Sequence, residues 1–212
     1  QYPDLTVDLT ISDRLVDLAE EGYDLALRIV PKVADHLVAT CLAPIRRKIC
    51  ASPAYIARHG MPHSPADLAG HNCLDYTYMN ARGVWHLHGP EGETAIPVAG
   101  SLRINDDEAL AQAVLGGLGM ALLPTFIVGR ELQAGRLVEV LPGYVPLERY
   151  LYAVYLPSRH LPLKVRAFIA FLQARFGKEP YWDRAEAPAG ALNAESIRQM
   201  AIPPPDAGSG RG

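Results

Sequence analysis

The stretch 110–126, LAQAVLGGLGMALLPTF, decides the fold because it joins the end of a helix to the start of a buried strand. Acidic and amide residues just before it can cap a helix over 106–116, since their oxygens accept from the free N–H groups of the first turn. The glycines after Leu115 end that helix and let backbones approach closely. The apolar run 120–124 then predicts a core strand, which a proline ends.

The same order of elements occurs near the start of the chain. An apolar run predicts a strand over 5–11, and SDRLVDLAEEG predicts a capped helix over 13–21 that stops at Gly22. A short apolar run over 24–30 predicts the next strand. Two occurrences of strand, capped helix, glycine and strand indicate two similar α/β lobes.

The segments that follow each unit also correspond. We expect strands over 45–51, 98–104 and 150–156, and helices that begin near proline over 53–60 and 162–176. On this basis lobe I comprises residues 1–74 with 157–177, and lobe II comprises 75–156. Residues 178–212, rich in Ala, Pro and Gly towards the end, are interpreted as a flexible tail.

The composition narrows the classes of function. A net charge of −3 over 212 residues does not favour DNA binding by electrostatics, which needs clustered Lys and Arg. The basic patch Arg46-Arg47-Lys48 is interpreted as a solvated strand face. We expect no membrane span and no signal peptide, because neither apolar pattern occurs. Three cysteines without CxxC spacing indicate reduced thiols and a cytoplasmic protein.

Candidate ligand-binding residues follow from the sheet arrangement. Open α/β sheets bind ligands at the carboxyl ends of strands, beside helix N-termini that favour anions. This rule selects ten residues: Ser12, Asp13, Arg28, Ile29, Tyr76, Thr77, Asn105, Asp106, Pro124 and Thr125. Structural roles are the alternative, because Ser12, Asn105 and Asp106 suit helix termini, Arg28 suits an ion pair and Pro124 suits a strand end.

The sequence does not favour an enzyme. It has no GxSxG or HExxH motif, and its clustered glycines follow a helix instead of opening one. His86 and His88 are two residues apart on a possible strand, so their side chains face the same side, but a zinc site needs further ligands. We therefore expect no metal, no cofactor and no catalytic residues.

The ordered series of segments resembles the effector-binding domain of LysR-type transcriptional regulators. ASPAYIARHG (51–60) and GLGMALLP (117–124) carry most of the likeness, which extends over about residues 2–176. The resemblance implies two Rossmann-like lobes joined by a hinge, as in type 2 periplasmic binding proteins. It also implies that the usual first strand and helix of lobe I are absent from this chain.

The resemblance implies a function as well. A small effector, such as an organic acid or an aromatic compound, would bind between the lobes and control DNA binding by an N-terminal winged helix-turn-helix outside this chain. It implies a homodimer or homotetramer that pairs lobes antiparallel through the helices at 13–21 and 106–116. The alternatives are a free-standing solute-binding protein of the same fold and an enzyme on a related two-lobed scaffold.

Overall fold

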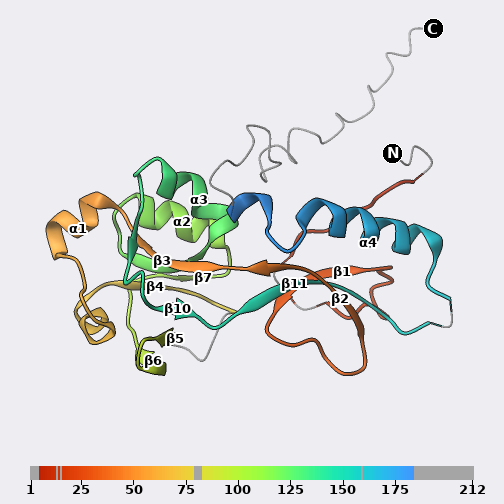
Figure 1. Cartoon of the computed structure of the whole chain (residues 1–212), viewed down its shortest axis with the longest axis horizontal. Helices are drawn as coiled ribbons and strands as arrows, with labels where there is room; N and C mark the ends of the chain where they lie inside the picture. Colours follow the sequence, from red (N-terminus) through yellow and green to blue (C-terminus); the bar gives the residue numbers. More distant parts are fainter. Residues whose placement is uncertain (1–4, 13, 15, 79–82, 159, 184–212) are drawn as a thin grey trace, which may run out of the picture.

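Two α/β lobes lie side by side in the computed structural model, which describes residues 5–12, 14, 16–78, 83–158 and 160–183 (Figure 1). Lobe II is built on a five-stranded sheet in the order β7-β4-β8-β3-β9. These strands are Arg103–Ile104 (β7), Cys73–Tyr76 (β4), Met120–Pro124 (β8), Arg47–Ala51 (β3) and Val138–Val140 (β9). All five residues of β8 are buried, as expected for an apolar run at the centre of a sheet.

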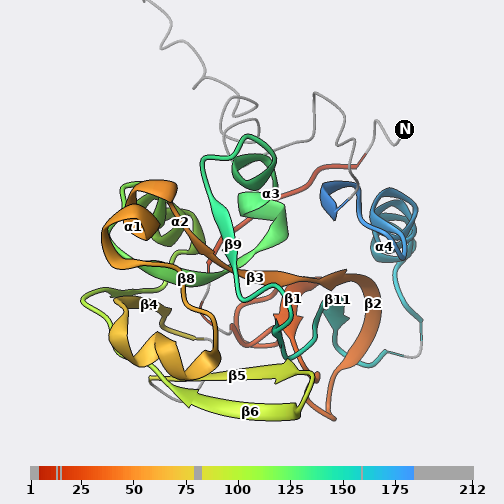
Figure 2. The ribbon, with the colours of Figure 1, turned by 60° about the vertical axis from the view of Figure 1, so that its left-hand side comes forward.

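Both faces of this sheet are covered. Helices Asp107–Leu115 (α2) and Thr125–Gln133 (α3) lie on one face (Figure 2). The other face carries the 3-10 helix Pro65–Gly70 (η1) and a small antiparallel sheet. That sheet has the order β10-β5-β6, formed by Val145–Pro146, Val84–Gly89 and Gly92–Pro97. Helix Pro53–His59 (α1) lies beside α2 (Figure 2) and packs Tyr55 into the core of this second face. Side chains of β8 alternate between the two cores, so Leu122 and Leu123 belong to different clusters.

The glycines of the opening stretch have distinct roles. Gly117 has φ +76°, a left-handed conformation that follows the end of α2. At Gly119, an added Cβ would lie 2.2 Å from the carbonyl oxygen of Asn72. The residue after it, Met120, donates its N–H to that same oxygen at 3.0 Å. Gly119 therefore permits the close approach of β8 to the chain entering β4, so the close backbone approach expected at these glycines joins two strands.

Lobe I contains a three-stranded antiparallel sheet in the order β1-β11-β2. Its strands are Ala26–Val30 (β1), Val38–Ile45 (β2) and Arg149–Tyr155 (β11), and helix Leu163–Phe176 (α4) covers one face. The apolar side of α4 packs on β2 and β11 through a cluster of Leu42, Ala153, Val165, Ile169 and Leu172. The helical periodicity expected over 162–176 is confirmed.

The chain passes between the lobes at two adjacent places. β2 ends at Ile45 and β3 begins at Arg47, so Arg46 alone separates a lobe I strand from a lobe II strand. The second passage runs from β10 into β11, whose first residue, Arg149, pairs with Ile45. Two neighbouring strands with short connections form the hinge of a two-lobed fold.

The strand pairing divides the chain differently from the sequence-based division at residue 74. β3 pairs with β8 and β9, so residues 47–74 build lobe II. β11 pairs with β1 and β2, so residues 149–155 build lobe I. Runs of similar apolar character do not reveal which strand will be the partner, because pairing is decided by contacts distant in sequence.

The strand expected over 5–11 and the helix over 13–21 are not formed in the described part of the chain. Val7, Leu9 and Ile11 are 55%, 60% and 77% exposed, and none of residues 5–12 joins a sheet. An alternating apolar pattern becomes a strand only beside a partner strand. Residues 18–22 form a turn in which the Asp17 carboxylate accepts from the N–H groups of two later residues. Residues 13 and 15 lie outside the described residues.

Three other differences concern the middle and the end of the chain. The strand expected over 98–104 is confined to β7. β5 includes the possible strand at His86 and His88, while β2, β6 and α3 were not expected. Tyr181–Asp183 form a 3-10 helix (η2) that packs against α3, so this part of the expected tail is folded onto the molecule. Residues 184–212 lie outside the described residues.

Candidate functional site

The carboxyl ends of three lobe II strands meet at the edge of the sheet that faces the hinge. β4 runs parallel to both β7 and β8, and these strands end at Tyr76, Ile104 and Pro124. Arg47, the first residue of antiparallel β3, pairs with Pro124 beside them. Because β3 follows β2 of lobe I directly, this edge lies where the two lobes meet.

Six of the ten sequence-predicted residues lie along this edge. They are Tyr76, Thr77, Asn105, Asp106, Pro124 and Thr125. The backbone N–H of Thr77 donates to the carbonyl of Ile104 at 2.8 Å, which fixes the two strand ends side by side. Topology therefore brings together residues from three separate stretches of sequence, as the strand-end rule anticipates.

The helix termini at this edge use their own polar groups. The Asp106 carboxylate caps α2 by accepting from the N–H groups of Glu108 and Ala109, both at 2.9 Å. At the start of α3, Thr125 donates its backbone N–H at 3.0 Å and its hydroxyl at 3.3 Å to the carbonyl of Arg46. The Asp106 contacts match the structural alternative given for that residue, so an anion would not find the first turn of α2 uncapped.

The candidates in lobe I are more dispersed. The Arg28 guanidinium donates to the Val16 carbonyl at 2.5 Å, and Ile29 is 36% exposed. β1 ends at the hinge, because its last residue pairs with the neighbour of Arg149. Ser12 accepts only a local contact among those described, from the N–H of Arg14 at 3.2 Å. Asp13 lies outside the described residues.

Arg47 is the central residue of this edge, and the interpretation of its segment as a solvated face is wrong at this position. Its side chain is 6% exposed, and its Nη2 donates to Oδ1 of Asp107 at 2.6 Å. Its guanidinium lies over the Tyr76 ring, 5.7 Å from the centroid. Strand alternation carries the missed signal, because Ile45, Arg47 and Ile49 are all buried while Arg46 is exposed.

Arg149 adds a second cation from the lobe I side of the hinge. Burial lowers the pKa of Arg149, and it lowers that of Arg47 too, with repulsion between the two guanidinium groups contributing at Arg47. Asp107 and Tyr76 have the opposite effect, because each raises the pKa of both arginines. Because arginine stays protonated, these shifts mean that Arg47 carries its charge in a desolvated place, and that half-buried Arg149 carries a second charge near it.

Arg47 also has an unmet hydrogen-bonding group. Within the described residues, its buried Nε–H finds no acceptor, although its Nη2 is paired with Asp107. Buried donors in native proteins are nearly always satisfied, and an exception calls for a specific reason. A buried donor on a cation, beside a second cation, provides the chemistry to bind an anion.

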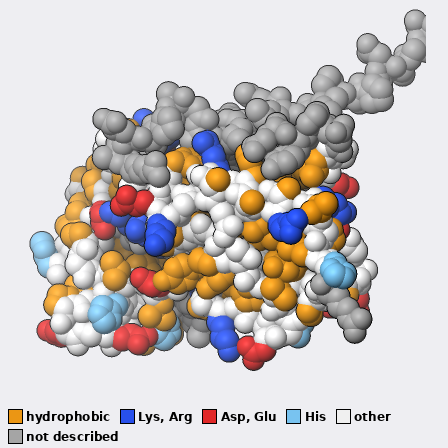
Figure 3. Space-filling view, turned by 45° about the vertical axis from the view of Figure 1, so that its right-hand side comes forward, with side chains coloured by type: hydrophobic (Ala, Val, Ile, Leu, Met, Phe, Trp, Pro, Cys, Tyr) orange, Lys and Arg blue, Asp and Glu red, His pale blue; other side chains and the backbone are white. Residues whose placement is uncertain are grey.

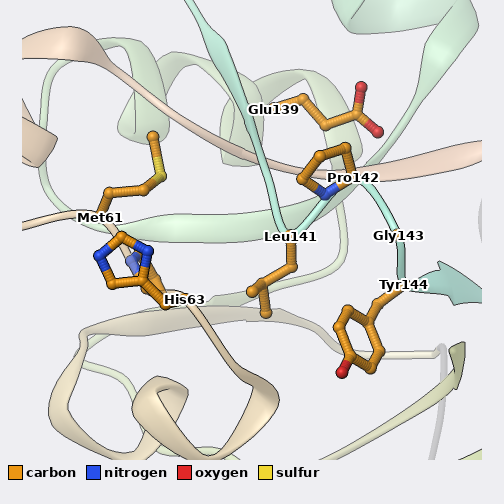
Figure 4. A pocket seen from close by; sticks show the side chains of 8 residues that line it. Met61, His63, Glu139, Leu141, Pro142, Gly143 and Tyr144 are labelled. Atoms are coloured by element: carbon orange, nitrogen blue, oxygen red, sulfur yellow. The ribbon is translucent and has the colours of Figure 1, made fainter. Parts of the chain in front are cut away.

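Two surface cavities of lobe II are less suited to a polar ligand. One, of about 320 Å³, is lined by Met61, Pro62, His63, Glu139, Leu141, Pro142, Gly143 and Tyr144 (Figure 4). Figure 4 shows the Glu139 carboxylate turned away from Leu141 and Tyr144, and it pairs with Lys48 at 2.5 Å. The other, of about 620 Å³, lies between α1, α2 and α3, and its Glu131 and Arg136 pair with each other.

Other chemistries have little basis in the described residues. No group of three His, Cys, Asp or Glu among them is placed to hold a metal ion. Burial raises the pKa of Cys50 and of Cys73 to about 12, which leaves these thiols poor nucleophiles near neutral pH. Across the residues described, no helix has the length and apolar character to cross a bilayer. On the face in Figure 3, basic side chains stand singly or beside acidic ones.

Together, the hinge and the charged edge define a two-lobed α/β ligand-binding domain. The chain belongs to the LysR substrate binding domain family, whose model matches residues 1–177. This membership confirms the family and the two-lobed, periplasmic-binding-protein-like fold expected from the sequence.

Known proteins agree with this assignment. The chain is 39% identical over 182 residues to the HTH-type transcriptional regulator DmlR of Escherichia coli K12, covering 84% of this chain but 58% of that protein. The full-length virulence activator AphB of Vibrio cholerae, a member of the LTTR family, matches 82% of this chain and 59% of its own with TM-score 0.71 and 28% identity. The CrgA regulatory domain of Neisseria meningitidis matches 75% of this chain and 78% of its own, with TM-score 0.66 and 29% identity. These relatives are transcriptional regulators, which favours a regulator over a solute-binding protein or an enzyme.

Proposed function

We propose that this chain is the ligand-sensing regulatory domain of a LysR-type transcription factor. A small effector binds between the lobes and controls DNA binding by a winged helix-turn-helix elsewhere in the protein. The names of the relatives support the regulatory role, and the chain spans about three fifths of the first of them. The observation that carries the ligand-binding part is the buried Nε–H of Arg47, which has no acceptor among the described residues and lies at the hinge near Arg149.

The ligand class follows from the groups at that edge. Arg47 offers a buried Nε–H from lobe II, and Arg149 offers a second cation from the first residue of β11. A carboxylate matches the fork of a guanidinium in charge and geometry, and its negative charge would offset the repulsion between Arg47 and Arg149. We therefore propose a small organic acid as the effector. Tyr76, under the Arg47 guanidinium, gives the site one flat aromatic wall.

A ligand placed there would influence the angle between the lobes. Arg47 is fixed in lobe II by Asp107, whereas Arg149 opens a strand paired with both outer strands of lobe I. An anion held by both arginines binds one interlobe geometry better than others, and this difference in affinity shifts the population. In a full-length regulator, the shift would alter how the DNA-binding heads are presented.

Calorimetry and thermal unfolding with carboxylates test the proposal. Malonate, succinate and benzoate should be titrated against chloride at matched ionic strength, using the wild type, Arg47→Lys and Arg149→Met. Arg166→Met, at an exposed position on α4, is the matched control. We expect at least one acid to bind, with at least about tenfold weaker binding in the two site variants, corresponding to about 1.4 kcal/mol. Equal affinity in all four proteins, or no binding of any acid, contradicts the proposal.

We also propose self-association, as the resemblance implies, with α2 as one contact element. The second expected element, the helix over 13–21, is not formed in the described residues. Light scattering across micromolar concentrations tests this proposal, and a strict monomer at tens of micromolar argues against it.

A further inference from the structure

The segment after α4 connects the two lobes a third time, without crossing through a strand. It leaves lobe I at Gly177 and places η2 on α3 of lobe II, as the short blue helix between α3 and α4 in Figure 1 shows. The Trp182 ring contacts both lobes. Its centroid lies 5.4 Å from that of Phe176 in α4 and 5.9 Å from that of Phe126 in α3, both in edge-on arrangements.

The next residue reaches the hinge itself. The Asp183 side chain is only 7% exposed, and its Oδ2 accepts from Nη1 of Arg46 at 2.6 Å. Arg46 is the residue between β2 and β3, and its carbonyl accepts from the backbone N–H of Thr125 at 3.0 Å. One hinge residue is therefore held by η2 through its side chain and by α3 through its backbone.

The fit between η2 and α3 depends on a small residue. A Cβ added at Gly129 would lie 3.3 Å from the carbonyl oxygen of Trp182, which is closer than most such contacts. On the lobe I side, the Arg175 guanidinium lies over the Tyr181 ring, 5.0 Å from its centroid. The segment thus has specific contacts on both lobes.

We propose that residues 177–183 form an interlobe strap that restrains the angle between the lobes. Figure 1 shows α3, η2 and α4 on one side of the strands that pass between the lobes, so the strap lies to one side of the hinge and reaches it only through Asp183. A contact away from a hinge axis resists rotation about it. Trp182 and Asp183 are both positioning residues. Asp183 acts on the ligand site through Arg46, whose neighbour Arg47 belongs to that site. Trp182 acts through its ring contacts with α3 and α4.

The strap is built so that it can also release. Among the described residues, the buried Nε1–H of Trp182 has no acceptor. The docked form, in which this donor has no acceptor, is therefore less stable relative to an undocked form in which water can accept from it. A change of lobe angle would break the Trp182 and Asp183 contacts together. The strap therefore sets how far the ligand-free domain is biased towards one lobe angle, and this consequence for regulation rests on the proposed function.

Distances between spin labels test the strap without any ligand. Cys41 in β2 is exposed, whereas Cys50 and Cys73 are buried, so a nitroxide label will attach to Cys41 and to an added cysteine at exposed Ala57 of α1. These positions report on lobe I and lobe II. We expect one narrow distance distribution in the Ala57→Cys protein and loss of that single peak when Trp182→Ala or Asp183→Asn is added.

Two further variants make the test specific. Lys178→Gln removes an exposed charge from the same segment and should keep the narrow distribution. Arg46→Glu alone should lose the narrow distance distribution, and the exchange of charges in Arg46→Glu with Asp183→Arg should restore it. This pair of variants also keeps the test valid if Trp182→Ala does not fold. Unchanged distributions in Asp183→Asn and Arg46→Glu overturn the strap. Because no carboxylate is added, that outcome leaves the ligand-binding proposal to its own test.

Discussion

Replacing Asp107 with alanine should destabilise the domain by about 3 kcal/mol. The change leaves the Arg47 guanidinium buried, with a 6% exposed side chain, and removes its carboxylate partner at 2.6 Å. Loss of one partner from a buried pair costs about 3–5 kcal/mol, and the lower end applies because the Asp107 side chain is 17% exposed. For a chain of this size, 3 kcal/mol corresponds to a fall in Tm of about 6–12 °C.

Urea unfolding followed by tryptophan fluorescence and circular dichroism measures this loss, since Trp85 is 1% exposed in lobe II. Asp24→Ala is the matched control. Its pair with Lys164 has an N–O distance of 2.5 Å, but both side chains are 57% exposed. We expect the control to lose less than about 0.5 kcal/mol.

A double variant separates the buried charge from general damage at this position. Arg47→Met with Asp107→Leu removes both charges of the pair and should recover part of the stability, because no charge at position 47 then needs a partner, although Arg149 still loses the attraction of Asp107. If Asp107→Ala costs no more than Asp24→Ala, or if the double variant is as unstable as the single one, then Arg47 does not depend on Asp107 and the reasoning about a desolvated cation is refuted.

Three other predictions follow from the described contacts. Gly119→Ala should cost about 1–3 kcal/mol in urea unfolding, because the new methyl group meets the carbonyl described above and the backbone must move; a loss below about 0.5 kcal/mol would contradict the close approach. A thiol reagent should modify Cys41 rapidly in the folded protein and Cys50 and Cys73 only on unfolding, since burial raises the pKa of both buried thiols to about 12; three fast thiols would disprove the burial. The pKa of His71 lies below its usual 6.5. Burial is the main cause, and repulsion from nearby His59 lowers it further. The unfolded chain therefore takes up a proton that the folded chain does not as pH falls below 6.5, so stability should decrease towards pH 5, and His71→Gln should flatten that dependence in urea unfolding.

The candidate site was predictable in part. The strand-end rule needs only the order of strands and helices, so the amino-acid sequence was enough to assign Tyr76, Thr77, Asn105 and Asp106 to one edge. The rule could not find Arg149, because nothing near it in the sequence says that its strand begins at the hinge. Arg47 was misinterpreted for a related reason, since a run of three basic residues resembles a solvated face unless the alternation around it is followed.

The sequence by itself determined the features whose causes are local: the Asp106 cap and glycine stop of α2, the fully apolar β8 and the inward stripe of α4. Each depends on residues within a few turns or alternations of one another. Only the tertiary structure decided that residues 5–11 form no strand, that β3 joins lobe II, that two distant arginines converge at the hinge, and that Trp182 and Asp183 fold back onto the other lobe. The physical reason is that strand partners, ion-pair partners and interlobe contacts come from segments far apart along the chain, and their positions are fixed only when the whole core is packed.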